Sequence, residues 1–209
     1  MRQPQPPWLG PPDNVLGVSV PLEPLLLART DTAAVSLGGF VAYPTGVEFM
    51  LAVRRRNVEE DEDWVGRHMH PRRRRGGELP PEFLRFGVEF RDGRKATNLG
   101  GRDARLEPGE WPSDAPVLIE RGGGGAATRY DQAYWLWPLP PPGTLGFVAE
   151  WPSEGIPLTR VEVDAKTILD ASARATVLWE PMGGGRSGVR SSTQYAVASE
   201  VQIDDELST

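Results

Sequence analysis

Residues 130–151 read YDQAYWLWPLPPPGTLGFVAEW, and this stretch decides the fold class. Aromatic and branched side chains on both sides of the proline-rich centre favour extended strands. The prolines stiffen the connection and a closing glycine restores backbone freedom, so the two strands are predicted to pair as a hairpin. Alternation along the first strand places Tyr134 and Leu136 on one face and Trp135 and Trp137 on the other. The second face is therefore either covered by a neighbouring element or exposed as a binding surface.

Similar strand patterns extend outward from this stretch. Residues 47–53 and 84–90 alternate apolar and polar side chains, and each run adjoins a turn signal, Tyr43-Pro-Thr-Gly46 or Asp92-Gly93. Residues 25–27 predict a strand buried on both faces. Further strands are expected from these shorter segments: 15–20, 35–41, 94–98, 117–119, 159–163 and, as a last strand or clasp, 176–179.

A single helix is expected, with Asp164 as its N-cap and an end near residue 174. About eight to ten short strands predict a mainly β fold, a two-sheet antiparallel β-sandwich with one short helix near 165–174. An immunoglobulin-like and a jelly-roll strand order both remain open.

The composition shifts along the chain predict one domain with interruptions. Residues 1–13 are expected to form an extended, proline-rich leader outside the core, and residues 14–182 the β-sandwich. Opposed blocks of Arg and Asp/Glu predict a disordered insertion over 54–81. The run Gly122 to Gly125 predicts a flexible loop over 121–127, and residues 183–209 a disordered or loosely attached tail.

The composition also excludes several function classes. The 209 residues include no cysteine, which removes disulfides, zinc-thiolate sites and a cysteine nucleophile. The net charge of −6 argues against nucleic acid as the main partner. The first residues lack the apolar run of a signal peptide and no later run is long enough to span a bilayer, so we expect a cytoplasmic protein with no membrane partner.

Four segments resemble uncharacterised proteins of high-GC actinobacteria. They are W-x-W-P-L-P-P-P-G at 135–143, F-V-A-E-W-P-x-x-G-I-P at 147–157, G-x-x-x-Y-P-T-G-x-x-F at 39–49 and F-x-x-x-F-x-D-G at 86–93. The similarity covers roughly residues 25–179 without the charged insertion, and the strong use of arginine over lysine fits a high-GC genome. The resemblance implies a domain that exists in its own right, and it carries no activity or site residue.

Residues able to perform chemistry are few. The only histidines, His68 and His70, lie in the charged insertion without a third metal ligand, and no G-x-S-x-G elbow precedes a helix. Loop histidines are the simpler interpretation. The glycine runs at 122–125 and 183–185 lack the strand, helix and Lys-Ser/Thr of a phosphate-binding loop. No cofactor or metal is expected.

The aromatic stretch offers one catalytic alternative. Glu150 and Asp131, with Trp135, Trp137 and Trp151, are the candidate surface for a carbohydrate, and a glycosidase needs two acids about 5 to 9 Å apart. The simpler interpretation is an outward-facing strand carboxylate beside core tryptophans. The leading hypothesis is therefore a non-catalytic interaction or accessory module whose partner is another protein or a second copy. A second alternative is weak nucleic-acid binding through the arginine-rich loop at 54–77.

Overall fold

Strands make up most of residues 6–56, 68–69, 79–100 and 115–179, which are the residues that the computed structural model describes. In chain order the elements are β1 (Val15–Leu16), β2 (Val18–Ser19), β3 (Leu25–Arg29), β4 (Ala33–Tyr43), β5 (Gly46–Arg55), β6 (Arg85–Phe90), β7 (Lys95–Thr97), β8 (Val117–Ala126), β9 (Arg129–Trp137), β10 (Thr144–Trp151), β11 (Ile156–Asp164), α2 (Ala165–Ser172) and β12 (Thr176–Val177). Short 3-10 turns follow β7 at Asn98–Gly100 and β10 at Pro152–Glu154.

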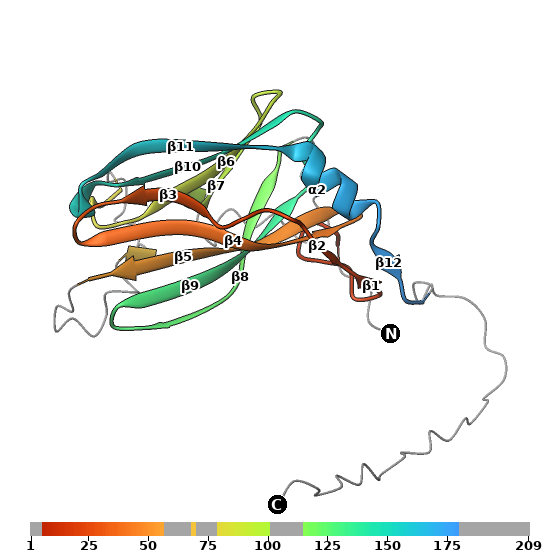
Figure 1. The fold of residues 1–209 in the computed structure, drawn as a ribbon, viewed down its shortest axis with the longest axis horizontal. Helices are drawn as coiled ribbons and strands as arrows, with labels where there is room; N and C mark the ends of the chain where they lie inside the picture. The colour runs from red at the N-terminus through yellow and green to blue at the C-terminus, as the bar shows by residue number, and fades with distance from the viewer. Residues whose placement is uncertain (1–5, 57–67, 70–78, 101–114, 180–209) are drawn as a thin grey trace, which may run out of the picture.

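Two antiparallel sheets form the layers of the molecule (Figure 1). The first sheet has the order β2-β4-β5-β9-β8, and β3 also pairs with β4; the second has the order β11-β10-β6-β7. The predicted fold class, mainly β and antiparallel with one helix, is confirmed. The turn signals hold as well: Tyr43 pairs with Gly46, and Gly93 takes a φ of 86° in the turn between β6 and β7.

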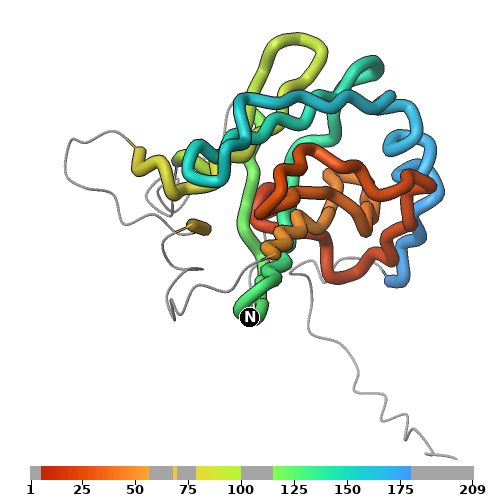
Figure 2. The backbone as a smooth tube through the Cα atoms, turned by 60° about the vertical axis from the view of Figure 1, so that its left-hand side comes forward, coloured from red at the N-terminus to blue at the C-terminus, as the bar shows by residue number. Residues whose placement is uncertain are grey.

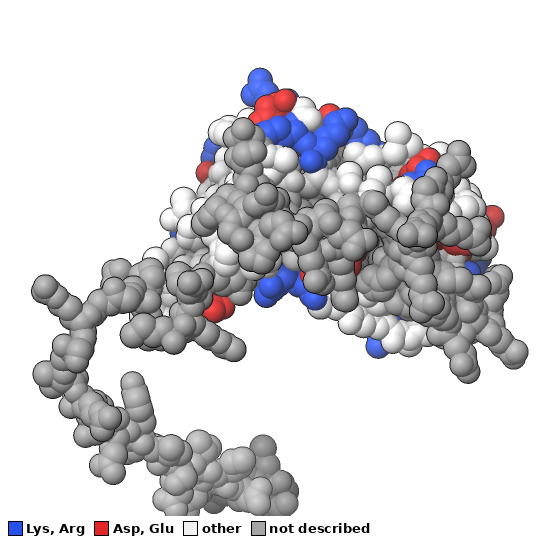
Figure 3. Space-filling model, turned by 180° about the vertical axis from the view of Figure 1, so that it is seen from behind, with Lys and Arg blue, Asp and Glu red and all other residues white. Residues whose placement is uncertain are grey.

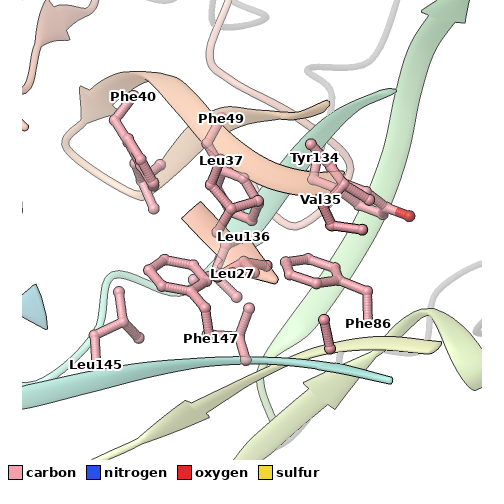
Figure 4. Close-up of a cluster of buried hydrophobic side chains, with 14 of the residues drawn as sticks. Leu27, Val35, Leu37, Phe40, Phe49, Phe86, Tyr134, Leu136, Leu145 and Phe147 are labelled. Carbon is pink, nitrogen blue, oxygen red and sulfur yellow. The ribbon is translucent and has the colours of Figure 1, made fainter. Parts of the chain in front are cut away.

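The core lies between the two sheets and is rich in phenylalanine. Phe49 of the first sheet packs edge-on against Phe147 of the second with ring centroids 5.5 Å apart, and Phe86 lies 5.4 Å from Tyr134 across the same gap. Figure 4 shows these rings meeting from both layers. Because the alternation in β5 and β6 puts every second side chain inward, the buried faces are those that the sequence predicted.

The predicted hairpin of residues 130–151 is wrong. β9 pairs with β5 and β8, whereas β10 pairs with β6 and β11, so residues 138–143 cross from one sheet to the other. Four of those six residues are prolines, which lack the N–H groups that a ladder between the two strands would use. Residues 25–27 also differ from the prediction, because Leu26 is 54% exposed on the outer side of β3.

The glycine run is a strand, not the predicted flexible loop over 121–127. β8 continues to Ala126, with Gly123 opposite Gln132 and Gly125 opposite Tyr130 after a bulge. A Cβ on Gly125 would lie 2.2 Å from the backbone oxygen of Arg129, so the close approach of the two strands requires glycine there. The glycine composition alone predicted a flexible backbone, whereas pairing with β9 fixes the backbone of this segment.

Helix α2 and the paired chain ends close one end of the layers (Figure 2). As predicted, the Asp164 side chain caps the helix by accepting a hydrogen bond of 2.9 Å from the backbone N–H of Lys166. Beyond the helix, β12 pairs with β1, with Val177 opposite Val15, so residues 176–177 form the last strand that the sequence offered as one of two options. No helix among the described residues is long and apolar enough to cross a bilayer.

The predicted insertion begins later than residue 54. Arg54 and Arg55 belong to β5, and His68 and Met69 are buried. The Nδ1 atom of His68 lies 2.6 Å from the carbonyl oxygen of Glu82, so this histidine is a packed residue rather than a loop residue. His70 and most of 57–78, like the tail over 183–209, lie outside the described residues.

Candidate interaction site

The five predicted site residues do not come together. Trp151 is on the inner face of β10, inside the core, where its Nε1 donates a hydrogen bond of 2.8 Å to the carbonyl oxygen of Glu82. Glu150 is on the opposite, outer face of the same strand and forms an ion pair of 2.6 Å with Arg85. Trp151 is therefore a core residue, and Glu150 is a surface carboxylate with a basic partner.

The two candidate carboxylates lie on opposite sides of the molecule. Asp131 is on the outer face of the first sheet, where Arg54 holds it at 2.7 Å, and Glu150 is on the outer face of the second sheet. Packed sheets are about 10 Å apart before their outward side chains are added. The two acids therefore cannot flank one glycosidic bond at the required spacing.

Trp135 is the predicted site residue with the most distinctive surroundings. It is on the outer face of β9, with Trp137 and Asp131, yet it is 0% exposed and does not belong to the core cluster. Its Nε1 donates a hydrogen bond of 3.0 Å to the carbonyl oxygen of Pro7. The leader therefore covers the second aromatic face that the alternation of residues 134–137 leaves outside the core.

The leader is folded, not extended as predicted. The backbone N–H of Leu9 bonds to the carbonyl of Pro6 at 3.0 Å, and that of Val15 bonds to the carbonyl of Pro12 at 3.3 Å. Proline favours such turns because its φ is fixed near the value that they need. Described residues of the leader contribute nothing to the core cluster, and they form no strand with the first sheet.

We use the name Trp135 site for the outer-face residues around this indole: Tyr43, Gly46, Glu48, Arg121 and Trp135. Tyr43 packs edge-on against Trp135 with centroids 5.7 Å apart, and Glu48 lies directly across the ladder from Trp135. Arg121 reaches from β8 and donates a hydrogen bond of 3.1 Å to the carbonyl oxygen of Leu9.

The Trp135 indole packs tightly against its neighbours, and the Tyr43 hydroxyl beside it is partly buried. A Cβ on Gly46 would lie 2.5 Å from Cζ2 of Trp135, so glycine allows the indole to lie against the backbone at the start of β5. Burial raises the pKa of the Tyr43 hydroxyl, the negative charge of Glu48 raises it further, and the positive charge of Arg121 opposes the shift.

A second feature of the surface is apolar. We use the name clasp surface for the exposed large side chains of β1, β12 and the two residues after β12. They are Leu16, Val177, Leu178 and Trp179, which are 47% to 61% exposed. The ribbon is stabilised by its own contacts, since Asn14 donates a side-chain hydrogen bond of 2.9 Å to the carbonyl of Trp179. Neither β1 nor β12 contains a charged residue.

The outer face of the second sheet is charged but balanced. Arg160 binds both Glu89 and Glu162, and Lys95 lies 3.6 Å from Glu89. The guanidinium lies over Gly146, where a Cβ would be 2.7 Å from its Cζ. In Figure 3 a run of basic atoms along the upper rim has acidic atoms beside it. Arg160 and Lys95 of this face are therefore paired with carboxylates.

No group of three or more potential metal ligands occurs within the described part of the chain. Comparisons of the chain with protein-family models, with curated proteins and with solved structures gave no match.

Proposed function

We propose that this protein is a non-catalytic interaction module that binds another protein through the clasp surface. The observation that carries this proposal is the exposure of four large apolar side chains on one two-stranded ribbon. Exposed sheet edges are usually protected by charge or proline, and this ribbon has neither within its strands. Leu16, which pairs with Thr176, projects from one face of the ribbon, and Val177, which pairs with Val15, projects from the other. Large apolar side chains are therefore exposed on both faces, and exposed apolar side chains that include a tryptophan are typical of a protein-binding site.

The chemistry of the described residues supports binding over catalysis. The candidate acids Asp131 and Glu150 are each neutralised by an arginine, on opposite sides of the fold. The His68 ring is packed against Trp151 with its Nδ1 held at the Glu82 carbonyl. A catalytic site needs such groups to converge on one reacting atom, and here they diverge.

The alternatives from the sequence receive different support. A carbohydrate platform needs exposed aromatic faces, and Trp135 and Trp151 have none. The arginine run at 72–75 lies outside the described residues, so nucleic-acid binding through it stays a prediction, tested by deleting that loop.

A capture experiment with matched variants tests the clasp surface. The double variant Leu178→Ser, Trp179→Ser removes two of its apolar side chains, and Leu158→Ser, at a residue that is 70% exposed on β11, is the control. We expect the double variant to retain about a tenth or less of the partner that wild type captures from a lysate of the source organism. The control should capture the wild-type amount.

Equal capture by wild type and the double variant would contradict the proposal, and so would an equal loss in the Leu158 variant. Sedimentation of the purified protein identifies the partner class. If the wild type forms a dimer that the double variant does not form, the partner is a second copy.

A further inference from the structure

We propose that the Trp135 site is a binding site for proline-rich segments, and that residues 6–12 of this chain occupy it as an internal ligand. The occupant in a complex is a proline-rich segment of another protein, which replaces the leader. This site is on the outer face of the first sheet and shares no residue with the clasp surface.

The hydrogen bonds from Trp135 and Arg121 to the leader run in one direction, from the domain to the leader. Both donors belong to the folded domain, the indole N–H of Trp135 and the guanidinium of Arg121, and both acceptors are leader carbonyls, those of Pro7 and Leu9. A proline-rich segment has carbonyl acceptors but few N–H donors, so a site that recognises one must supply the donors. The Trp135 site has that arrangement.

The shape of the site supports the proposal as well. Tyr43 meets Trp135 edge-on, and Gly46 leaves room for the indole to lie against the strand. Because proline fixes φ, the turned, proline-rich segment loses little backbone entropy when it packs against these aromatic rings. The segment seated here, Pro-Pro-Trp-Leu-Gly-Pro-Pro at 6–12, has that composition.

The leader is attached to the domain without strand pairing. Its own turns use the N–H groups of Leu9 and Val15, and it makes no strand pairing with the sheet that it covers. Segments held by few contacts outside the core detach locally, without unfolding of the domain. Because the leader is tethered, its effective concentration at the site is about millimolar, so a free peptide competes poorly until the leader is weakened.

Binding of a labelled peptide to the full-length protein tests the proposal. The probe has the sequence of residues 1–13 with a fluorophore at its C-terminus, and a peptide with all prolines changed to serine is its control. The variant Pro6→Gly, Pro7→Gly loosens the leader turns and leaves the Trp135 site intact. We expect fluorescence anisotropy to show at least about tenfold tighter peptide binding to this variant than to wild type.

Site variants in the loosened-leader background identify the binding residues. Trp135→Phe removes the indole donor and Arg121→Ala removes the exposed guanidinium, and each is expected to abolish the gain in affinity. Trp151→Phe, which removes an equivalent indole donor in the core, should keep it. The clasp variant Leu178→Ser, Trp179→Ser should also keep it.

The proposal is overturned if wild type and the loosened-leader variant bind the peptide equally, or if neither binds it. It is also overturned if the gain survives Arg121→Ala and Trp135→Phe together, or if the serine peptide binds as well as the proline peptide. Circular dichroism of each variant shows that its sheet structure is intact, and Arg121→Ala serves alone if Trp135→Phe does not fold.

Discussion

The indole Nε1 of Trp135 donates a hydrogen bond of 3.0 Å to the carbonyl oxygen of Pro7, which lies 128 residues earlier in the chain. Trp151 makes the same kind of bond, 2.8 Å long, to the carbonyl oxygen of Glu82, but from inside the core. Two tryptophans with similar local chemistry thus hold two different segments. One holds the leader on the outer face of the first sheet, and the other holds the chain entry to β6.

Replacing these two tryptophans separates their roles. In Trp135→Phe the leader loses the hydrogen bond from the indole to Pro7, so we expect chymotrypsin to cleave after Trp8 or Leu9 faster than in wild type. Trp151→Phe should lower the midpoint of urea denaturation without changing leader cleavage. Equal leader cleavage in wild type and Trp135→Phe would show that the hydrogen bond to Pro7 does not hold the leader.

The ion pair between Arg55 and Glu154 joins β5 of the first sheet to the 3-10 turn that follows β10 of the second. Its atoms are 3.1 Å apart, the side chains are only 10% and 9% exposed, and Glu154 also accepts a hydrogen bond of 3.0 Å from Thr32. Removing the carboxylate takes away both this ion pair and the hydrogen bond from Thr32, so Glu154→Ala should lower the free energy of unfolding by about 1.5 to 3 kcal/mol. Urea denaturation measures this change.

The exposed pair of Lys166 and Asp170 on α2 is the matched control, because solvent screens it. Asp170→Ala should leave the denaturation midpoint unchanged. A similar small effect for both variants would show that the inter-sheet pair contributes nothing particular to the fold.

Two tyrosines of β9 are expected to respond differently to loss of their hydroxyl groups. The Tyr130 hydroxyl donates a hydrogen bond of 2.8 Å to the buried side chain of Gln132, whereas the Tyr134 hydroxyl is buried without a hydrogen-bond partner among the described residues. Figure 4 shows the Tyr134 oxygen pointing away from the phenylalanine cluster. Burial, the first cause, and then the negative charge of Glu120 raise the pKa of Tyr134 far above its ordinary value.

Tyr130→Phe should therefore cost about 1 to 3 kcal/mol of unfolding free energy, because it leaves the Gln132 oxygen without this donor. Tyr134→Phe should change the stability by less than about 1 kcal/mol or increase it, because the hydroxyl makes no hydrogen bond of normal geometry. A larger loss for Tyr134→Phe than for Tyr130→Phe contradicts this account of the buried hydroxyls.

The charged row on the second sheet predicts a specific pH dependence. The hydrogen bond from Arg160 is the main cause that lowers the pKa of Glu89, and Lys95 lowers it further. A lowered folded-state pKa stabilises the fold at neutral pH, and this contribution is lost as the pH falls through that value. Arg160→Ala should raise the pKa of Glu89 toward its ordinary value, and the stability difference from wild type should shrink in acid.

Carboxyl titration by carbon NMR measures this shift directly. Asp92 is the internal control, because Arg94 lowers its pKa independently of Arg160. If Glu89 titrates identically in wild type and Arg160→Ala, then Arg160 of β11 does not control the pKa of Glu89 on β6.

Local sequence patterns predicted the local structure well. Alternation in residues 47–53 and 84–90 located buried faces, and the turn residues at 43–46 and 92–93 located both hairpins, because each signal depends on neighbours in the chain. Asp164 marked the helix start for the same reason. These features need no information about distant partners.

The errors concern pairing between distant segments. The predicted hairpin of residues 130–151 is wrong because β9 pairs with β5 and β10 pairs with β6. The sequence of residues 130–151 does not contain these distant partners. The glycine run at 122–125 was predicted to be free because composition does not show that β9 pairs with it. The leader was placed outside the core correctly, but its contact with Trp135 has a weak signal, the apolar pair Trp8-Leu9 among prolines.

Hydrogen exchange at the indole nitrogens tests the central claim, that the leader is a replaceable occupant of the Trp135 site. Nitrogen-15 NMR of the wild-type protein resolves the Trp135 and Trp151 indole N–H groups separately. The account predicts that the Trp135 N–H exchanges faster than the Trp151 N–H, since the first needs only local detachment of the leader and the second needs opening of the core. Exchange of both at the same rate, set by global unfolding, would contradict it.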